Sequence, residues 1–136
     1  MKMKILLSTM LFALGLTAQA QTVRNSYNST VAKIESNGTV RNANNAYIGK
    51  FDGSTIRNKN NSSVGSISSD GTIRNGYGSV VCKIYNDGTV RDGMNRTLGK
   101  VESGGTVRNA NNSTIGSGNG VKREWLAAYF FGNFFN

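Results

Sequence analysis

Six arginines recur along the chain at intervals of about 17 residues, and each lies within the same four-residue phrase. The phrase reads Thr, then Val or Ile, then Arg, then Asn or Asp. A guanidinium group keeps its positive charge and offers a planar set of donors that matches phosphate, sulfate and carboxylate groups. The candidate ligand-binding residues are therefore Arg24, Arg41, Arg57, Arg74, Arg91 and Arg108.

A second cationic series accompanies the arginines and consists of Lys33, Lys50, Lys83 and Lys100. The whole chain has 16 Lys and Arg residues against 7 Asp and Glu residues, which gives a formal net charge of +9. A basic protein outside the cell meets anionic glycans, lipid headgroups and released DNA. An architectural interpretation competes with ligand binding, since each arginine would bond carbonyl or turn groups and hold successive units in register. The sequence leaves both interpretations open.

Residue types that carry out catalysis are scarce in this chain. It has no His, the commonest general base, and its one cysteine, Cys82, has no partner for an internal disulfide. Asp52, Asp70 and Asp87 occupy turn positions, where a short polar side chain serves the backbone. We therefore expect a small buried residue at Cys82, and no catalytic residue, cofactor or bound metal.

One unit of the repeat, residues 39–52, shows how the arginines would be positioned. Thr39, Val40 and Arg41 alternate polar and apolar, which is the period of a strand with one buried face. Asn45 fills a slot that holds only Asn or Gly in every unit, which favours a type I turn closed by a left-handed residue. A second strand follows, and Asn-Gly or Asp-Gly pairs then predict tight two-residue reversals. The chain thus predicts a succession of about a dozen short strands.

The second strand of each unit carries a small residue at one recurring position. Small residues at an equivalent position in every unit indicate that backbones crowd together on that face. We expect this crowding at a central axis where all units meet and bury their Val, Ile and Phe side chains, because isolated hairpins are marginal in water. The small positions are Ala32, Gly49, Gly65, Cys82, Gly99 and Gly116.

The N-terminal end of the chain differs from the repeat. Residues 1–20 have a basic start, an apolar run and the sequence Ala18-Gln19-Ala20, which predicts a signal peptide cleaved before Gln21. We expect the protein to be exported, to the periplasm or to the extracellular space. Residues 21–120 then form the hairpin-repeat domain.

Residues 121–136 form an apolar, aromatic C-terminal segment. Residues 124–131 predict a short helix, which Gly132 and Asn133 should end. A helix that is apolar on all sides is normally buried, so we expect a plug that covers or fills one end of the β assembly. The alternative is an anchor on a membrane surface, on a partner or on a second copy of the chain. The segment is too short for a membrane-spanning helix.

The repeat motif, the signal peptide and the aromatic tail resemble those of the small secreted bacterial proteins described as five-fold β-flowers. The motif combines Asp-Gly-Thr-Ile-Arg-Asn, as at residues 70–75, with Ile-Gly-Lys, as at residues 48–50. The resemblance implies hairpins that radiate around a shared axis like petals, and it implies no established activity. The phrase starts six times, but only five second strands look complete, because Ile115-Gly116-Ser117 breaks into Gly118-Asn119-Gly120. This count is compatible with five hairpins and a closing strand.

These patterns predict an all-β fold of tandem short β-hairpins arranged around a common axis, with a short apolar C-terminal helix or plug. The expected role is structural or interaction-based at the cell envelope, without catalysis. The alternative is a binding module for an anionic polymer, which would be a glycan, a lipid headgroup or extracellular nucleic acid, through the repeated arginines. A third interpretation is self-assembly into fibres of Asn-rich strands, although the tight turns and many charges weigh against it.

Overall fold

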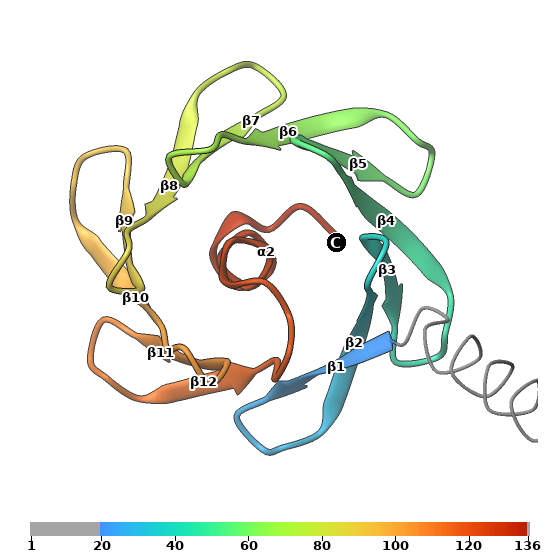
Figure 1. Ribbon diagram of the computed structural model, residues 1–136, viewed down its shortest axis with the longest axis horizontal. Helices are drawn as coiled ribbons and strands as arrows, with labels where there is room; N and C mark the ends of the chain where they lie inside the picture. The colour runs from blue at the N-terminus through green and yellow to red at the C-terminus, as the bar shows by residue number, and fades with distance from the viewer. Residues whose placement is uncertain (1–19, 136) are drawn as a thin grey trace, which may run out of the picture.

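The computed structural model describes residues 20–135 as a closed barrel of twelve antiparallel strands with a helical segment in its centre (Figure 1). Each strand pairs with the next one in the chain, and β12 pairs with β1 to close the ring. The predicted all-β fold of hairpins around a common axis is confirmed. The strands are β1 (Ala20–Asn25), β2 (Thr30–Glu35), β3 (Thr39–Asn42), β4 (Tyr47–Asp52), β5 (Thr55–Asn58), β6 (Ser63–Ile67), β7 (Thr72–Asn75), β8 (Val80–Ile84), β9 (Thr89–Asp92), β10 (Thr97–Val101), β11 (Thr106–Asn109) and β12 (Thr114–Ser117).

The signal peptide predicted for residues 1–20 lies outside the described residues, apart from Ala20, which is the first residue of β1.

The barrel contains six hairpins, so the count of five second strands and a closing strand is wrong. Hairpins 1 to 6 run from β1–β2 to β11–β12, and β12 pairs with both β11 and β1. The sixth second strand looks broken because Gly118 stands where other hairpins have a larger residue, such as Ile34 or Val101. A Cβ atom at Gly118 would lie 2.5 Å from Cδ2 of Leu126, so a side chain of the C-terminal segment fills that space instead.

Two kinds of turn alternate around the ring. Outer turns connect the two strands of one hairpin and project at the rim, whereas inner turns join successive hairpins nearer the axis (Figure 1). In the first outer turn the Asn28 amide donates to the Asn25 carbonyl at 3.0 Å, and Asn28 has a φ of 64°. In the inner turn before β9 the Gly88 amide donates to the Tyr85 carbonyl at 2.9 Å, and Gly88 has a φ of 91°. Both loops have three residues and end in a left-handed residue, as predicted for the outer turns.

The prediction of two-residue reversals is wrong for every inner turn except one. These loops are one residue longer, and in three of the four the turn Asn or Asp, as at Asp87, accepts the amide of the Thr two residues later at 2.9–3.0 Å. The fourth has Gly104 at this position. Only Gly53 and Ser54 form a two-residue turn, since Asp52 pairs directly with Thr55. That repeat is accordingly one residue shorter than its neighbours.

The inner face of the barrel carries the apolar residue of each repeated phrase. Because successive side chains of a strand point to opposite faces, burying this residue turns the Thr and Arg beside it outward. The six apolar residues are each 0% exposed: Val23, Val40, Ile56, Ile73, Val90 and Val107.

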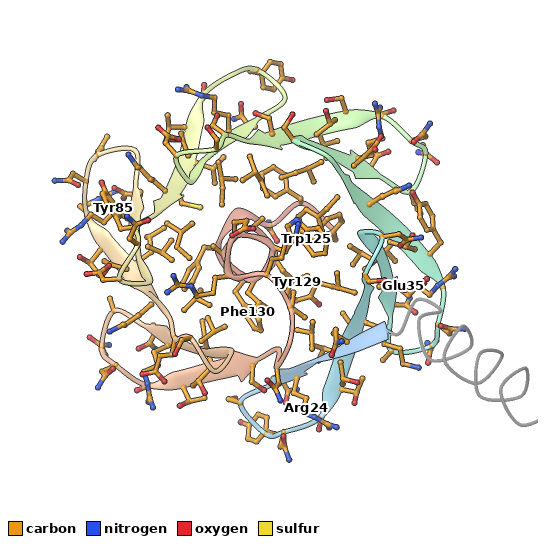
Figure 2. The ribbon with its side chains drawn as sticks, viewed as in Figure 1. Arg24, Glu35, Tyr85, Trp125, Tyr129 and Phe130 are labelled. Carbon is orange, nitrogen blue, oxygen red and sulfur yellow. The ribbon has the colours of Figure 1, made fainter. Side chains whose placement is uncertain are left out.

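The C-terminal segment occupies the centre of the barrel, as predicted for a plug (Figures 1 and 2). The α-helix α2 (Arg123–Ala127) continues directly into the π-helix η1 (Ala128–Gly132). Asn133 follows with a φ of 60° and ends the helix, as predicted. Leu126, Ala127 and Ala128 are fully buried, and Figure 2 shows Trp125, Tyr129 and Phe130 inside the ring.

The small residues of the second strands make room for the aromatic rings of this segment. Crowding at these positions was predicted, but phenylalanine rings and the carbonyls of neighbouring strands cause it. A Cβ atom at Gly65, for example, would lie 2.6 Å from Phe134 Cε1 and 2.6 Å from the Arg74 carbonyl oxygen. Each glycine faces a different ring: Gly49 faces Phe135, Gly65 faces Phe134, Gly99 faces Phe131 and Gly116 faces Phe130.

The two remaining small positions carry a side chain. Ala32 and Cys82 belong to hairpins 1 and 4, on opposite sides of the ring, and both are fully buried. The four phenylalanines are therefore divided into two pairs, one on each side of the line that joins these hairpins.

We predict that Gly65→Ala destabilises the protein by about 2–3 kcal/mol, because the new methyl group overpacks a site between a ring and a backbone carbonyl. The matched control is Cys82→Ala at the equivalent position of hairpin 4, which removes one sulfur atom and should cost about 1 kcal/mol. Unfolding in urea, followed by circular dichroism, measures both changes. Equal losses for the two variants would contradict the assignment of the glycine to ring packing.

Candidate functional site

The six candidate arginines occupy one equivalent position on the outer face of the barrel. In every hairpin the arginine Nη1 donates to the carbonyl of the left-handed residue in the outer turn. The distances are 3.1 Å for Arg24 to Asn28, 3.4 Å for Arg41 to Asn45, 3.2 Å for Arg57 to Asn61, 3.0 Å for Arg74 to Gly78, 3.3 Å for Arg91 to Asn95 and 3.3 Å for Arg108 to Asn112.

The residue after each arginine holds the other side of the same turn. In hairpin 1, Asn25 Oδ1 accepts the amides of Tyr27 at 2.9 Å and Ser29 at 3.0 Å. The equivalent side chain makes the same two bonds in all six hairpins, including Asp92 in hairpin 5. The repeated phrase therefore has a structural explanation at each position after the Thr. The Val or Ile is a core residue, the Arg donates to the turn carbonyl, and the Asn or Asp accepts the turn amides.

The hydrogen bonds within the barrel involve only some of the guanidinium donors. Nη2 of these six arginines has no acceptor among residues 20–135, although a guanidinium group carries five N–H donors. Each arginine is thus fixed in position by its turn and keeps donors that have no acceptor among residues 20–135. Whether those donors bind a ligand stays a prediction.

Four of the six arginines lie directly opposite a lysine on the neighbouring strand. The register pairs Lys33 with Arg41, Lys50 with Arg57, Lys83 with Arg91 and Lys100 with Arg108. Like charges directly opposite each other across a sheet are destabilising. In the other two pairs the lysine position holds Ser: Ser66 faces Arg74 and Ser117 faces Arg24. We call the six arginines and four lysines the basic belt.

Carboxylates neutralise only part of the basic belt. Three arginines form ion pairs at 2.7–3.3 Å and one lysine forms a longer one at 3.8 Å. Where a Lys–Arg pair meets one carboxylate, one positive charge remains. The ion pairs are Arg41–Glu35, Arg57–Asp52, Arg108–Glu102 and Lys83–Asp70.

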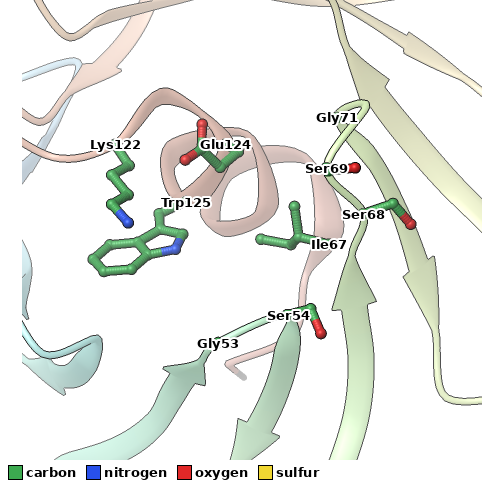
Figure 3. A pocket seen from close by; sticks show the side chains of 9 residues that line it. All are labelled: Gly53, Ser54, Ile67, Ser68, Ser69, Gly71, Lys122, Glu124 and Trp125. Carbon is green, nitrogen blue, oxygen red and sulfur yellow. The ribbon is translucent and has the colours of Figure 1, made fainter.

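A shallow groove at the inner-turn end is a second candidate site, with a volume of about 350 Å³ (Figure 3). Both faces of its Trp125 ring are occupied, because Phe51 stacks on the ring at 5.1 Å and Lys122 Nζ lies 4.8 Å from its centre. Only the edge of the indole is therefore available to a ligand. The groove is lined by Gly53, Ser54, Ile67, Ser68, Ser69, Gly71, Lys122, Glu124 and Trp125.

Residues that ligate metals do not cluster in the described part of the chain. No group of three or more His, Cys, Asp or Glu residues there is placed to hold a metal ion. Cys82 is fully buried, as predicted, and burial raises the pKa of its thiol to about 12, which keeps it protonated. None of the helices described is long and apolar enough to cross a membrane.

The model of one protein family, described as "5-fold beta-flower protein", matches residues 20–136. This chain belongs to that family. The family resemblance drawn from the repeat motif is thereby confirmed, although the described residues of this beta-flower protein form six hairpins. The family description names a fold and no reaction. A search of curated proteins and a search of solved structures each found no match.

The sequence revealed both cationic series of this beta-flower protein but not how they face each other. Strand register depends on the length of the turns, and all inner turns but Gly53-Ser54 are one residue longer than predicted. The sequence also identified the glycine positions of the second strands, but not the phenylalanine rings that face them. The signal that could have revealed them is the match between four glycines and the two Phe-Phe pairs of the tail, Phe130-Phe131 and Phe134-Phe135.

Three aspartates in the turns have pKa values below the usual 3.8. For Asp70 and Asp87 the main cause is a hydrogen bond from the backbone amide of the Thr two residues later. For Asp92 it is the backbone amide of Arg96. A carboxylate whose pKa is lowered by folding adds stability above its unfolded pKa, and this stability is lost as the pH falls through the folded value.

We predict that the free energy of unfolding decreases as the pH falls below about 4. Replacing all three aspartates by Asn, in the variant Asp70→Asn/Asp87→Asn/Asp92→Asn, should flatten this decrease. Asn occurs naturally at equivalent positions, as at Asn37 and Asn75, so the turns should keep their amide bonds. Denaturation in urea at several pH values measures the slope, and parallel curves for the two proteins would contradict the prediction.

Proposed function

We propose that this protein is an exported, non-enzymatic interaction protein of the cell envelope that binds an anionic polymer through the basic belt. The observation that carries the proposal is the placement of four lysines directly opposite four arginines. Such pairs lower the stability of a sheet, and the single carboxylate that meets each pair neutralises only one of its two charges, so a purely architectural role does not require the lysines.

The barrel itself does not require the lysines. Hairpins 3 and 6 have Ser66 and Ser117 at the lysine position and keep the same strand pairing. The arginines differ in this respect, because every one of them bonds a turn carbonyl. The lysines therefore add charge to a surface that already has its structural contacts, which favours a role in binding.

The belt offers repeated contacts to a repeated ligand. Its Lys–Arg pairs occupy hairpins spaced around the ring, and each guanidinium group keeps an Nη2 that has no acceptor among residues 20 to 135. Phosphate, sulfate or carboxylate groups along a polymer would each meet one pair, and the weak contacts would add up. The predicted signal peptide would place the protein where such polymers occur.

A structural role alone is the second candidate, because the arginine and asparagine bonds in all six outer turns support the architecture directly. In that case the arginine variants would lower stability and the belt would bind no polyanion.

We predict that Lys50→Ser/Lys100→Ser weakens binding to a polyanion and makes it less dependent on salt. With duplex DNA as the probe, the slope of log K against log salt should fall by about 0.9 for each lost phosphate contact. Fluorescence anisotropy of labelled DNA at several salt concentrations measures the slope, and a sulfated glycan serves as a second probe.

The control Lys59→Ser/Lys122→Ser removes the same number of charges outside the belt, from an outer turn and from the residue before α2. It should leave the slope nearly unchanged. Equal effects of the two double variants would show that net charge, and not the belt, governs binding.

A further inference from the structure

The six outer turns fall into two sets that differ in the residue at their tip. Hairpins 1, 4 and 5 carry a large apolar residue there: Tyr27 is 87% exposed, Tyr77 96% and Met94 78%. Hairpins 2, 3 and 6 carry an asparagine at the same place, namely Asn44, Asn60 and Asn111.

The ion pairs of the six belt arginines divide the hairpins in the same way. Hairpins 2, 3 and 6, with asparagine tips, have arginines paired to a carboxylate. Hairpins 1, 4 and 5 have Arg24, Arg74 and Arg91, which form no ion pair with any residue from 20 to 135. Every exposed apolar tip therefore stands on a turn whose carbonyl is bonded by an arginine without a carboxylate partner.

Negative charge is concentrated at the opposite end of the barrel. Five carboxylates belong to inner turns and Glu124 lies beside them at the start of α2. In the described chain only Asp92 is at an outer turn, where Arg96 pairs with it at 2.8 Å. The inner-turn carboxylates are Glu35, Asp52, Asp70, Asp87 and Glu102.

The tail brings aromatic side chains to the outer-turn end. Phe134 and Phe135 line a cavity together with Ile48 and the outer-turn residues Asn58, Lys59 and Asn60. The aromatic end of the tail therefore opens at the same end of the barrel as the outer turns. This face combines two phenylalanines beside hairpin 3, three apolar tips and an excess of positive charge.

We propose that the outer-turn face docks on the surface of an anionic lipid bilayer. Tyr27, Tyr77 and Met94 enter the interfacial region, and the unpaired arginines of the same hairpins bind lipid phosphates. Tyrosine suits the boundary between headgroups and acyl chains, and a cationic apolar face is the form that peripheral membrane contacts take. Three apolar tips on both sides of the ring suit a flat, partly apolar surface better than a single dissolved strand, so their coincidence with unpaired arginines favours the bilayer.

The position of the tips also sets the orientation. Hairpins 1 and 4 are opposite each other in the ring and hairpin 5 is next to hairpin 4, so the three tips lie on both sides of the axis. Contact through all three tips sets the barrel axis along the membrane normal. The inner-turn carboxylates then point away from the lipid. The inference rests on the proposed function, because it assigns a lipid source of phosphate to arginines of the basic belt.

The test is the variant Tyr27→Asn/Tyr77→Asn/Met94→Asn, which uses the residue found at the other three tips and should fold normally. Its control is Tyr85→Ser, an exposed tyrosine at the inner-turn end where hairpin 3 has Ser68. The Tyr85 ring lies beside Lys83 and Arg91, and its removal leaves both positive charges in place. Sedimentation with vesicles of phosphatidylcholine and phosphatidylglycerol should show binding of the wild-type chain and of the control. The triple variant should bind about tenfold more weakly or worse, and vesicles of phosphatidylcholine alone should bind little of any protein.

Binding to labelled DNA separates this inference from the proposed function. If the triple variant binds DNA normally and loses the vesicles, the inference is supported. The docking surface is wrong if the wild-type chain binds DNA but not anionic vesicles, or if the triple variant binds vesicles as well as the wild type does. The proposed binding of an anionic polymer by the basic belt is unaffected by either result. If the triple variant loses both ligands, the tips serve the dissolved polymer and the bilayer assignment is overturned.

Discussion

The barrel depends on an interior that its own side chains do not fill. The diameter of a β-barrel grows with the number of strands, and about eight is the number whose inward side chains just close the centre. Here twelve strands form the ring, and α2 with η1 supplies the missing core. Four glycines accept four phenylalanine rings, so the strands and the tail have matching shapes rather than merely matching hydrophobicity. The positions of the turns, and with them the belt and the tips, follow from this packing.

The six hairpins follow an approximate two-fold pattern, in which hairpins 1 to 3 resemble hairpins 4 to 6. Hairpins 1 and 4 share a tyrosine tip and a side chain at the small position, and hairpins 3 and 6 share a serine opposite the next arginine. The tail follows the same division, because Phe130 and Phe131 face hairpins 6 and 5 while Phe134 and Phe135 face hairpins 3 and 2. The ring is thus closer to two copies of a three-hairpin unit than to six equal petals.

Much of the fold could be predicted from the sequence because the deciding signals are local. The alternation around Val40, the left-handed Asn45 and the helix stop at Asn133 each depend on a few neighbouring residues. The sixth hairpin was missed because its apolar partner, Leu126, comes from a distant segment. The candidate site was harder to predict because its ion pairs join residues of different strands. An arginine has a carboxylate partner only where Glu35, Asp52 or Glu102 reaches across to the next strand.

The position of the plug after all twelve strands in the chain has a consequence for biosynthesis. The ring has no filled core until α2 and η1 have been made, so a nascent chain that carries only the strands has no stable barrel to form. Premature termination before Phe130 would remove both Phe-Phe pairs and leave the four glycine positions that face them vacant. A chain that lacks the whole segment would expose the apolar inner face of its strands, which makes it a target for aggregation and proteolysis.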